Sequence, residues 1–223
     1  MKPQICVAVI GRDTEQIIAR VRGLQQADLV EIRLDHRVEP IDLRRVRDAA
    51  ETPLIATNRP VYQGGRSKEP EEIRLGALYG ACKAGFEYAD VELVAPGSRD
   101  AVKRVHDLGS RCIVSHHDFE ATPTLGELGR MHAEAKSMGA DVVKLVGTAK
   151  CYGDNMVYLS YLSGNPGNVS FGMGRLGVPS RVMSPLVGGA FTYASTGEGE
   201  ESAPGQLTLT KMREIYEAME VET

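Results

Sequence analysis

Residues 141–150 read DVVKLVGTAK and carry a lysine inside an apolar run. Short runs of β-branched residues are typical of buried strands. Alternation along such a strand places Val142, Lys144 and Val146 on one face. Because an isolated buried charge is very costly, Lys144 must be ion-paired, neutral or chemically engaged. The strand alone favours a structural lysine that reaches solvent from a sheet edge, so its role depends on the rest of the chain.

Seven further runs of strand character recur roughly every 25–30 residues, and segments with helical spacing of apolar residues separate them. The predicted strands are residues 4–10, 28–35, 53–59, 88–94, 111–118, 141–150, 168–173 and 185–192. The predicted helices are residues 14–26, 41–50, 71–84, 99–108, 124–137, 155–162 and 210–220, and residues 176–183 are predicted as a short helix or a loop. Eight strand–helix units predict an α/β protein, a (β/α)8 TIM barrel with a single catalytic domain over residues 1–223.

A doubly wound open sheet is the alternative architecture. That fold usually carries a phosphate-binding glycine turn after its first strand. The corresponding residues here, Gly11-Arg12-Asp13, lack that fingerprint. The length of 223 residues also suits one barrel, because such barrels run to about 250 residues. The barrel is therefore favoured.

Composition narrows the class of function. A net charge of −4 with a pI near 5.8 argues against nucleic-acid and anionic-membrane partners. The chain shows neither an apolar run of transmembrane length nor a signal-peptide pattern at residues 1–10. Cys6, Cys82, Cys112 and Cys151 form no C-x-x-C pair, which is typical of reduced thiols in a cytoplasmic protein. The histidines and cysteines predict no metal site.

The barrel prediction turns the polar faces of several strands into the lumen, because their apolar faces must pack under helices. The inward ionisable side chains are Glu31, Arg33, Arg59, Asp90, His117 and Lys144. Branched apolar side chains normally fill a barrel lumen. So many ionisable groups indicate a site that encloses a polar ligand.

Lys144 and His117 fall on adjacent predicted strands, which run about 4.8 Å apart. Nearby arginines are expected to favour the neutral, nucleophilic amine of Lys144. These arginines are Arg33, Arg59 and Arg181. A neutral lysine condenses with a ketone to an imine, and the protonated imine acidifies the neighbouring C–H bond. His117 is placed to take that proton, and we expect Asp90 to hold its other ring nitrogen.

Several motifs follow one another in a characteristic order. They are VEIRLDH at 30–36, NRPVYQGG at 58–65, DVEL at 90–93, SHHDFEATP at 115–123, DVVKL at 141–145, GMGRLGVPSRV at 172–182, GGAFTYAS at 188–195 and SAPGQ at 202–206. Through them the chain resembles the type I 3-dehydroquinate dehydratases, Schiff-base enzymes of the shikimate pathway, over nearly its whole length.

The resemblance implies a TIM barrel, usually a homodimer, with no metal or organic cofactor. It implies the syn elimination of water from 3-dehydroquinate to give 3-dehydroshikimate. Lys144 matches the imine-forming lysine, and His117 matches the general base that also returns a proton to the departing hydroxyl. Arg181 matches the arginine that binds the substrate carboxylate, for which a guanidinium is well suited. Further substrate-binding residues implied in this way are Glu31, Arg33 and Arg59 at the hydroxyls, and Ser202 and Gln206 in a loop over the bound ring.

Two positions depart from the family pattern. Gln63 stands where the glycine-pair loop often carries a glutamate, which leaves only a supporting role for Gln63, as for Asp90. Gly172 stands where the family commonly has serine.

Two other functions stay open on the sequence. A class I aldolase acting on a phosphorylated sugar would use the same lysine, with Gly188-Gly189 at the phosphate. Arg181, Ser202 and Gln206 argue against it, because they suit a carboxylate and hydroxyls. A catalytically silent barrel that serves as a binding module is the second alternative.

Overall fold

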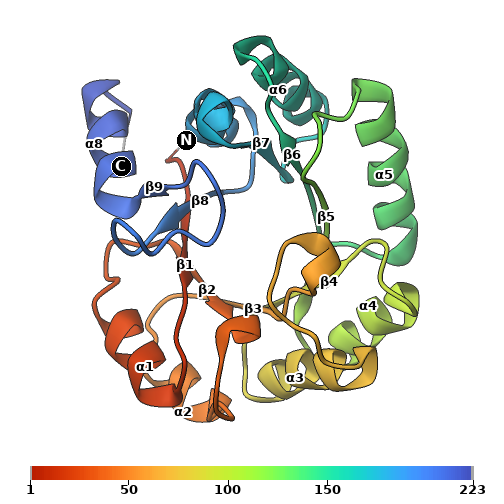
Figure 1. The fold of residues 1–223 in the computed structure, drawn as a ribbon, viewed down its shortest axis with the longest axis vertical. Helices are drawn as coiled ribbons and strands as arrows, with labels where there is room; N and C mark the ends of the chain where they lie inside the picture. Colours follow the sequence, from red (N-terminus) through yellow and green to blue (C-terminus); the bar gives the residue numbers. More distant parts are fainter. Residues whose placement is uncertain (1, 222–223) are drawn as a thin grey trace.

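The computed structural model describes residues 2–221, in which parallel strands form a ring and helices surround it (Figure 1). The strands are β1 (Ile5–Val9), β2 (Leu29–Arg33), β3 (Leu54–Thr57), β4 (Tyr88–Glu92), β5 (Arg111–Asp118), β6 (Val142–Thr148), β7 (Val169–Met173), β8 (Thr192–Ser195) and β9 (Leu207–Thr208). The helices are α1 (Thr14–Arg22), α2 (Leu43–Asp48), α3 (Glu71–Lys83), α4 (Ser98–Asp107), α5 (Leu125–Met138), α6 (Asn155–Gly164), α7 (Val178–Met183) and α8 (Leu209–Ala218).

The sheet order is β7-β6-β5-β4-β3-β2-β1-β8-β9, and every pair is parallel. Strands β1 to β7 therefore lie side by side in chain order, with no reversal of direction across the sheet. A doubly wound sheet requires such a reversal. The TIM-barrel prediction is confirmed. Separately, none of the helices within residues 2–221 is both long and apolar enough to cross a membrane.

Within residues 2–221 the strand ladder has a seam between β7 and β8, which side chains and loops close. The Ala190 N–H donates to the Asn168 carbonyl at 2.8 Å, just below the two strands. Inside the ring, Tyr193 of β8 meets Phe171 of β7 and the neighbouring Phe191 in edge contacts, with centroids 6.2 and 5.6 Å apart. Aromatic packing and isolated backbone hydrogen bonds thus close the seam in place of a regular strand ladder.

The predicted eighth strand, residues 185–192, is wrong. Residues Ser184–Val187 form a 3-10 turn, and Gly188 follows with a left-handed φ of 107°. Strand β8 begins only at Thr192. Proline near the start of a helical turn and glycine after its end are both strand-breaking signals. Leu186 and Val187 of this segment pack against the cluster between strands and helices, whereas Ala190 and Phe191 pack inside the ring.

Side-chain alternation divides the interior into two layers, as predicted. Val143 and Leu145 of β6 belong to the large apolar cluster between the strands and the helices. Val142 and Val146 belong to a second cluster inside the ring, together with Ile55 of β3. Members of this cluster at the first positions of their strands, such as Leu29 and Tyr88, close the lumen at the amino-terminal ends, whereas Val146 and Phe171 line the pocket above. The charged side chains lie above it, where a barrel presents its reactive groups.

Candidate active site

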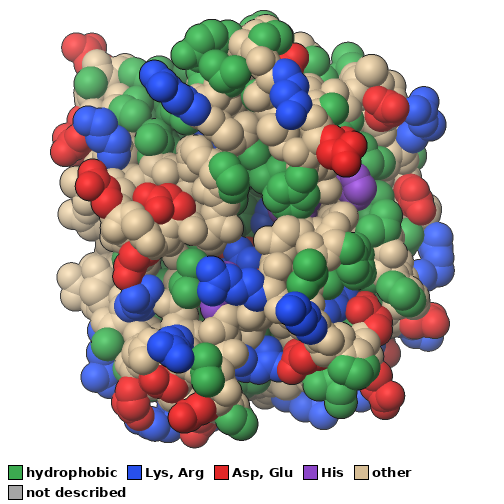
Figure 2. All heavy atoms as spheres, in the orientation of Figure 1, with side chains coloured by type: hydrophobic (Ala, Val, Ile, Leu, Met, Phe, Trp, Pro, Cys, Tyr) green, Lys and Arg blue, Asp and Glu red, His purple; other side chains and the backbone are tan. Residues whose placement is uncertain are grey.

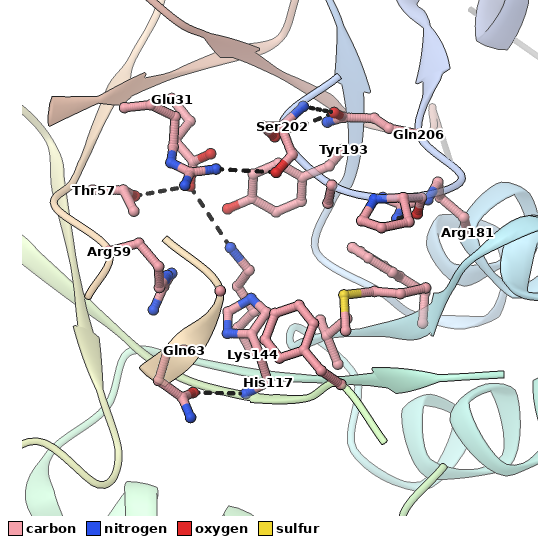
Figure 3. A pocket seen from close by; sticks show the side chains of 18 residues that line it. Glu31, Thr57, Arg59, Gln63, His117, Lys144, Arg181, Tyr193, Ser202 and Gln206 are labelled. Carbon is pink, nitrogen blue, oxygen red and sulfur yellow. Dashed lines mark hydrogen bonds and ion pairs between the residues drawn. The ribbon is translucent and has the colours of Figure 1, made fainter. Parts of the chain in front are cut away.

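Lys144 lies inside the ring in the middle of β6, with only 5% of its surface exposed. Its Nζ is 3.3 Å from Oδ2 of Asp90 and 3.7 Å from Oε1 of Glu31 (Figure 3). The ring of Tyr193 covers the nitrogen, with its centroid 4.1 Å away. The inward orientation of Lys144 is confirmed. Arg33, Arg59 and Arg181 line the same pocket as Lys144, but the carboxylates of Asp90 and Glu31 lie nearest to its nitrogen.

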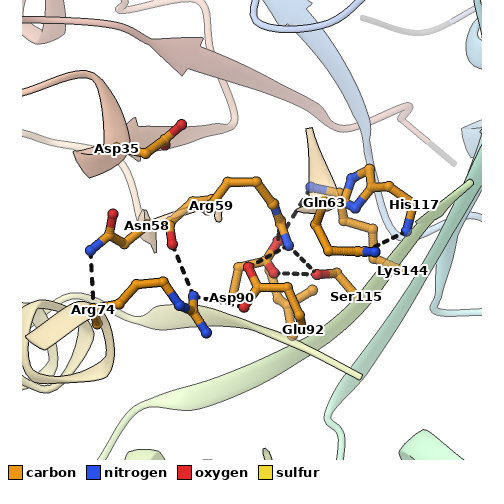
Figure 4. Close-up of polar contacts among 12 residues, drawn as sticks. Asp35, Asn58, Arg59, Gln63, Arg74, Asp90, Glu92, Ser115, His117 and Lys144 are labelled. Carbon is orange, nitrogen blue, oxygen red and sulfur yellow. Dashed lines mark hydrogen bonds and ion pairs between the residues drawn. The ribbon is translucent and has the colours of Figure 1, made fainter. Parts of the chain in front are cut away.

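Carboxylates pair with two of these arginines, Arg33 and Arg59, and Arg59 shares Oδ2 of Asp90 with Lys144. Arg59 donates to Asp90 at 2.6 Å and to Glu92 at 2.8 Å, and Arg74 of α3 pairs with the second oxygen of Glu92 at 2.7 Å (Figure 4). Ser115 donates to Asp90 at 2.5 Å. At most 3% of any of these side chains is exposed. A buried charge is tolerable only when it is paired in this way.

The pKa values within this network follow from burial and pairing. Burial works against ionisation of Asp90, but Arg59 and Lys144 outweigh it and lower its pKa to about 2. Burial likewise opposes the charge of Arg59, and the carboxylates of Asp90 and Glu92 reverse that effect and raise its pKa. Burial raises the pKa of Glu92 itself. The network therefore keeps Asp90 ionised beside Lys144.

Arg33 is held in a similar way at the end of β2. Its Nε and Nη2 donate to the two oxygens of Asp35 at 2.9 and 2.8 Å. Its Nη1 lies 3.4 Å from the Ser202 carbonyl. Arg33 therefore links the strand end to the loop that contains Ser202.

His117 lies near the end of β5, and its backbone N–H donates to Oε1 of Gln63 at 2.9 Å. Its Nδ1 is buried and has no hydrogen-bond partner among residues 2–221. The expected contact with Asp90 is wrong, because Asp90 pairs in register with Ile113, four residues before His117. Burial, followed by the nearby cations Arg59 and Lys144, lowers the pKa of His117 well below its usual value. The imidazole is therefore a neutral proton acceptor.

Arg181 of α7 is buried, with 1% of its surface exposed, and it forms no ion pair with an acidic side chain of the described chain. Burial lowers its pKa to about 10. The guanidinium lies 4.2 Å from the centroid of the Phe171 ring, and its Nη2 is 3.5 Å from the Pro204 carbonyl. A buried guanidinium without a carboxylate partner suits an anionic ligand, above all a planar carboxylate.

The loop at residues 202–206 lies over the ring, where both the Ser202 N–H and its hydroxyl contact Oε1 of Gln206, at 2.8 and 3.2 Å. Gly205 has a φ of 75°, and a Cβ there would lie 2.3 Å from the Gly174 carbonyl oxygen. The Gly174 N–H in turn donates to the Pro204 carbonyl at 3.1 Å. This close backbone approach fixes the loop to the end of β7.

These groups line one pocket, which opens as a hollow near the centre of the face in Figure 2. The predicted residues that line it are Glu31, Arg33, Arg59, Gln63, His117, Lys144, Arg181, Ser202 and Gln206. Asp90 does not line it and lies beneath Lys144. The prediction did not name several lining residues, which are Thr57, Gly64, Phe119, Val146, Phe171, Met173, Tyr193, Ala203 and Pro204.

Strand alternation contains a signal for some of the missed residues. Thr57 precedes Arg59 by two residues, and Val146 follows Lys144 by two, so each shares a strand face with a predicted residue. Tyr193 gave no such signal, because the eighth strand was misplaced. The described residues contain no group of three or more His, Cys, Asp or Glu side chains arranged to hold a metal ion.

The pocket geometry can be compared with known proteins. The model of the family described as type I 3-dehydroquinase matches residues 5–223. The 3-dehydroquinate dehydratase of Dehalococcoides mccartyi is 34% identical over 222 residues, which are 99% of this chain and 97% of that protein.

Two solved structures resemble the fold of this chain. The type I 3-dehydroquinate dehydratase of Clostridium difficile gives a TM-score of 0.88 at 26% identity, covering 98% of this chain and 92% of its own. The 3-dehydroquinate dehydratase of Geobacillus kaustophilus gives a TM-score of 0.88 at 25% identity, covering 99% and 92%. Sequence and fold therefore agree along the whole chain.

Proposed function

The chain belongs to the type I 3-dehydroquinase family, and from this we propose that it removes water from 3-dehydroquinate through an imine on Lys144, with His117 as the acid and base. Family membership makes the chain a 3-dehydroquinate dehydratase, a carbon–oxygen lyase. The observation that carries the proposed mechanism is one pocket that contains a buried lysine, a histidine with a lowered pKa and an arginine that has no acidic partner among residues 2–221.

The proposed reaction begins when the Lys144 nitrogen adds to the substrate ketone and water leaves. The resulting protonated imine withdraws electrons and weakens the adjacent C–H bond. Neutral His117 takes that proton and then gives it to the hydroxyl that departs as water. Hydrolysis of the imine releases the product and restores the lysine. The Clostridium difficile relative was solved with covalently modified comenic acid, which supports covalent chemistry in this family.

Substrate binding follows from the charges around the pocket. We propose that Arg181 binds the substrate carboxylate, since it is a buried guanidinium with no acidic partner among residues 2–221. Glu31, Arg33 and Arg59 would then contact the hydroxyls from the opposite side of the pocket. Ser202 and Gln206 would cover the ring from the loop.

Gln63 supports His117 through the backbone. Its Oε1 accepts from the His117 N–H, which fixes the end of β5 beside the pocket. An amide cannot give or take a proton at neutral pH, so we propose that Gln63 positions His117 and takes no part in proton transfer. Asp90 supports the site from below by holding Lys144 and Arg59.

We further propose that residues 1–223 act as one catalytic domain and work as a homodimer in the cytoplasm. The family resemblance supports the dimer, and four free thiols support a reducing compartment. Sedimentation velocity of the purified chain measures the oligomeric state, and a monomer at micromolar concentration would contradict the dimer.

Borohydride trapping tests the imine directly. The chain is mixed with 3-dehydroquinate, reduced, and weighed intact, and the adduct is mapped by peptide mass. We expect one adduct at Lys144, and its absence from folded protein would refute the mechanism. Lys144→Ala should abolish both adduct and turnover. The exposed neighbour Lys150→Ala is the control and should retain both.

The role of His117 is tested separately. His117→Ala should still form the imine but turn over about 10²–10⁴-fold more slowly, because only proton transfer is lost. Equal loss of imine formation and turnover would assign His117 to another step.

The aldolase alternative loses its main support in the structure. Gly188 and Gly189 do not line the pocket. They lie instead against Pro166 and Ser184, where added Cβ atoms would come within 3.2 and 2.6 Å of neighbouring atoms. Close backbone packing therefore explains the glycine pair. An assay for aldol cleavage against a panel of sugar phosphates should show no activity.

A further inference from the structure

An aromatic ring shares the buried environment of the Lys144 nitrogen. Nζ lies 4.1 Å from the centroid of the Tyr193 ring, and both side chains are at most 5% exposed. Figure 3 shows Tyr193 beside Lys144 within the pocket. The hydroxyl of Tyr193 is buried and has no hydrogen-bond partner in residues 2–221. The face of the ring, and not the hydroxyl, is therefore the part that Tyr193 presents to the lysine.

The contacts of Lys144 must change during the proposed reaction. Condensation converts R–NH₃⁺ and O=C into R–NH⁺=C and water, so a C–N bond forms and the C–O bond of the ketone breaks. The nitrogen keeps a positive charge but retains one N–H instead of three. A single N–H donates well to only one acceptor at a time. Nζ donates to Asp90 at 3.3 Å and lies 3.7 Å from the Glu31 carboxylate, and a single N–H cannot serve both.

The face of an aromatic ring does not need an N–H directed at it to attract a cation. Its quadrupole attracts positive charge whether or not an N–H points at it, and the attraction is strongest where water is excluded. The charge of a protonated imine is spread over nitrogen and carbon, which suits the extended face of an aromatic ring. The contact between Tyr193 and the nitrogen can therefore outlast the loss of two hydrogen atoms.

We propose that Tyr193 is a catalytic residue whose ring face stabilises the positive charge of the Lys144 imine. The inference rests on the proposed imine chemistry and adds a group to it. The ring is fixed for this task, because Phe171 and Phe191 both meet Tyr193 at interplanar angles of 63°. These edge contacts hold its face toward Nζ.

The same aromatic cluster also contacts another cation of the pocket, Arg181. Arg181 lies over the face of Phe171 at 4.2 Å, and Phe171 contacts Tyr193. The nitrogen that forms the imine and the guanidinium that binds the carboxylate are thus both placed by rings at the β7–β8 seam. The spacing of the two subsites depends on this packing.

Fluorinated rings test the electrostatic role at nearly constant shape. Tyr193→Phe is the parent of the series, because the fluorinated analogues also lack the hydroxyl. Phenylalanines with one, two and three fluorines are placed at residue 193, and imine formation is timed by rapid quenching with borohydride and intact mass. We expect a stepwise fall that reaches about tenfold with three fluorines, equivalent to about 1.4 kcal/mol.

The matched control is trifluorophenylalanine at Phe86, which is buried on the far side of the strands and does not line the pocket. It should leave the rate of imine formation unchanged, and thermal melting should show that each variant folds. Equal rates across the series at residue 193 would overturn the role of the ring face. Absence of any adduct in the unaltered chain would refute the imine itself, so the two failures are distinguishable.

Discussion

The position of the His117 ring lowers the pKa of its imidazole. Its Nδ1 is buried without a partner in the described chain, and the cations Arg59 and Lys144 face it. Both burial and these charges disfavour the imidazolium. The pH below which activity declines should therefore lie well below the usual histidine pKa.

We expect kcat to stay constant as the pH falls from 8 to about 6 and to decline only at lower pH. The sign follows from the lowered pKa: the neutral base is present above that pKa and is lost as the pH falls through it. A pH profile of kcat under saturating 3-dehydroquinate measures this limit. A decline centred near pH 6.5 would show that His117 keeps an ordinary pKa or is not the base.

At the residue scale, the sequence predicts which side chains turn inward but not which of them touch. Alternation alone places Lys144, Asp90 and Glu31 in the lumen. The partner of each depends on register and on side-chain reach, and these emerge only from the packed sheet. Asp90 illustrates this, because its level on β4 matches Ile113 and leaves His117 about 13 Å farther along β5.

The loop at residues 202–206 owes its position to backbone contact. Gly205 lies against the Gly174 carbonyl with a left-handed φ, so no other residue fits there without displacing the loop. Because Ser202 and Gln206 belong to the same loop, their place in the pocket depends on this contact.

Gly205→Ala should raise KM for 3-dehydroquinate by roughly tenfold, with a small effect on thermal stability, because the loop moves but the barrel core does not. The matched control is Gly199→Ala, at a glycine with a φ of 78° where an added Cβ would meet no atom within 4 Å. Steady-state kinetics and melting curves check both variants. Equal effects would assign the loss to backbone strain and not to the contact with Gly174.

At the element scale, the periodicity of apolar residues predicts which strands and helices exist, and their order, better than it predicts where each begins and ends. Seven strands fall where apolar runs predict them, although three of these runs contain Pro53, Gly147 or Gly172. The segment at residues 185–192 is as apolar as a strand, yet Pro185 and Gly188 make it a turn. The proline and glycine there outweigh the hydrophobicity of the segment. Because the predicted strand was misplaced, Tyr193 was not predicted as a pocket residue.

The whole molecule carries an unusual interior, since a network of buried charges occupies the lumen above an apolar floor. Asp90 has a folded pKa of about 2 against an ordinary value of 3.8. The unfolded chain therefore binds this proton at a higher pH than the folded chain does. Its contribution to stability is complete above about pH 4 and is lost as the pH falls through 2.

We expect the free energy of unfolding to fall by on the order of 2 kcal/mol between pH 4 and pH 2 through Asp90 alone. Asp90→Asn should be less stable at neutral pH and should show a flatter dependence on pH in this window. Exposed Asp107→Asn is the control. Urea unfolding followed by circular dichroism at several pH values measures both. Glu92 has the opposite effect on the pH dependence of stability, because burial raises its pKa. If Asp90→Asn leaves the slope of unfolding free energy against pH unchanged, other groups cause the loss of stability in acid.

The unpaired edge of β7 matters most while the chain is being synthesised. Strands β1 to β7, with Lys144 and His117, leave the ribosome before Arg181 and Tyr193 do. Until β8 emerges, β1 and β7 both expose unpaired N–H and carbonyl groups, which are templates for pairing with other chains. A nascent chain that stalls after β7 is therefore an aggregation hazard and not a weak enzyme. When β8 emerges, it pairs with β1 and brings Tyr193 against Phe171 at the seam, and the loop at residues 202–206 that follows completes the pocket.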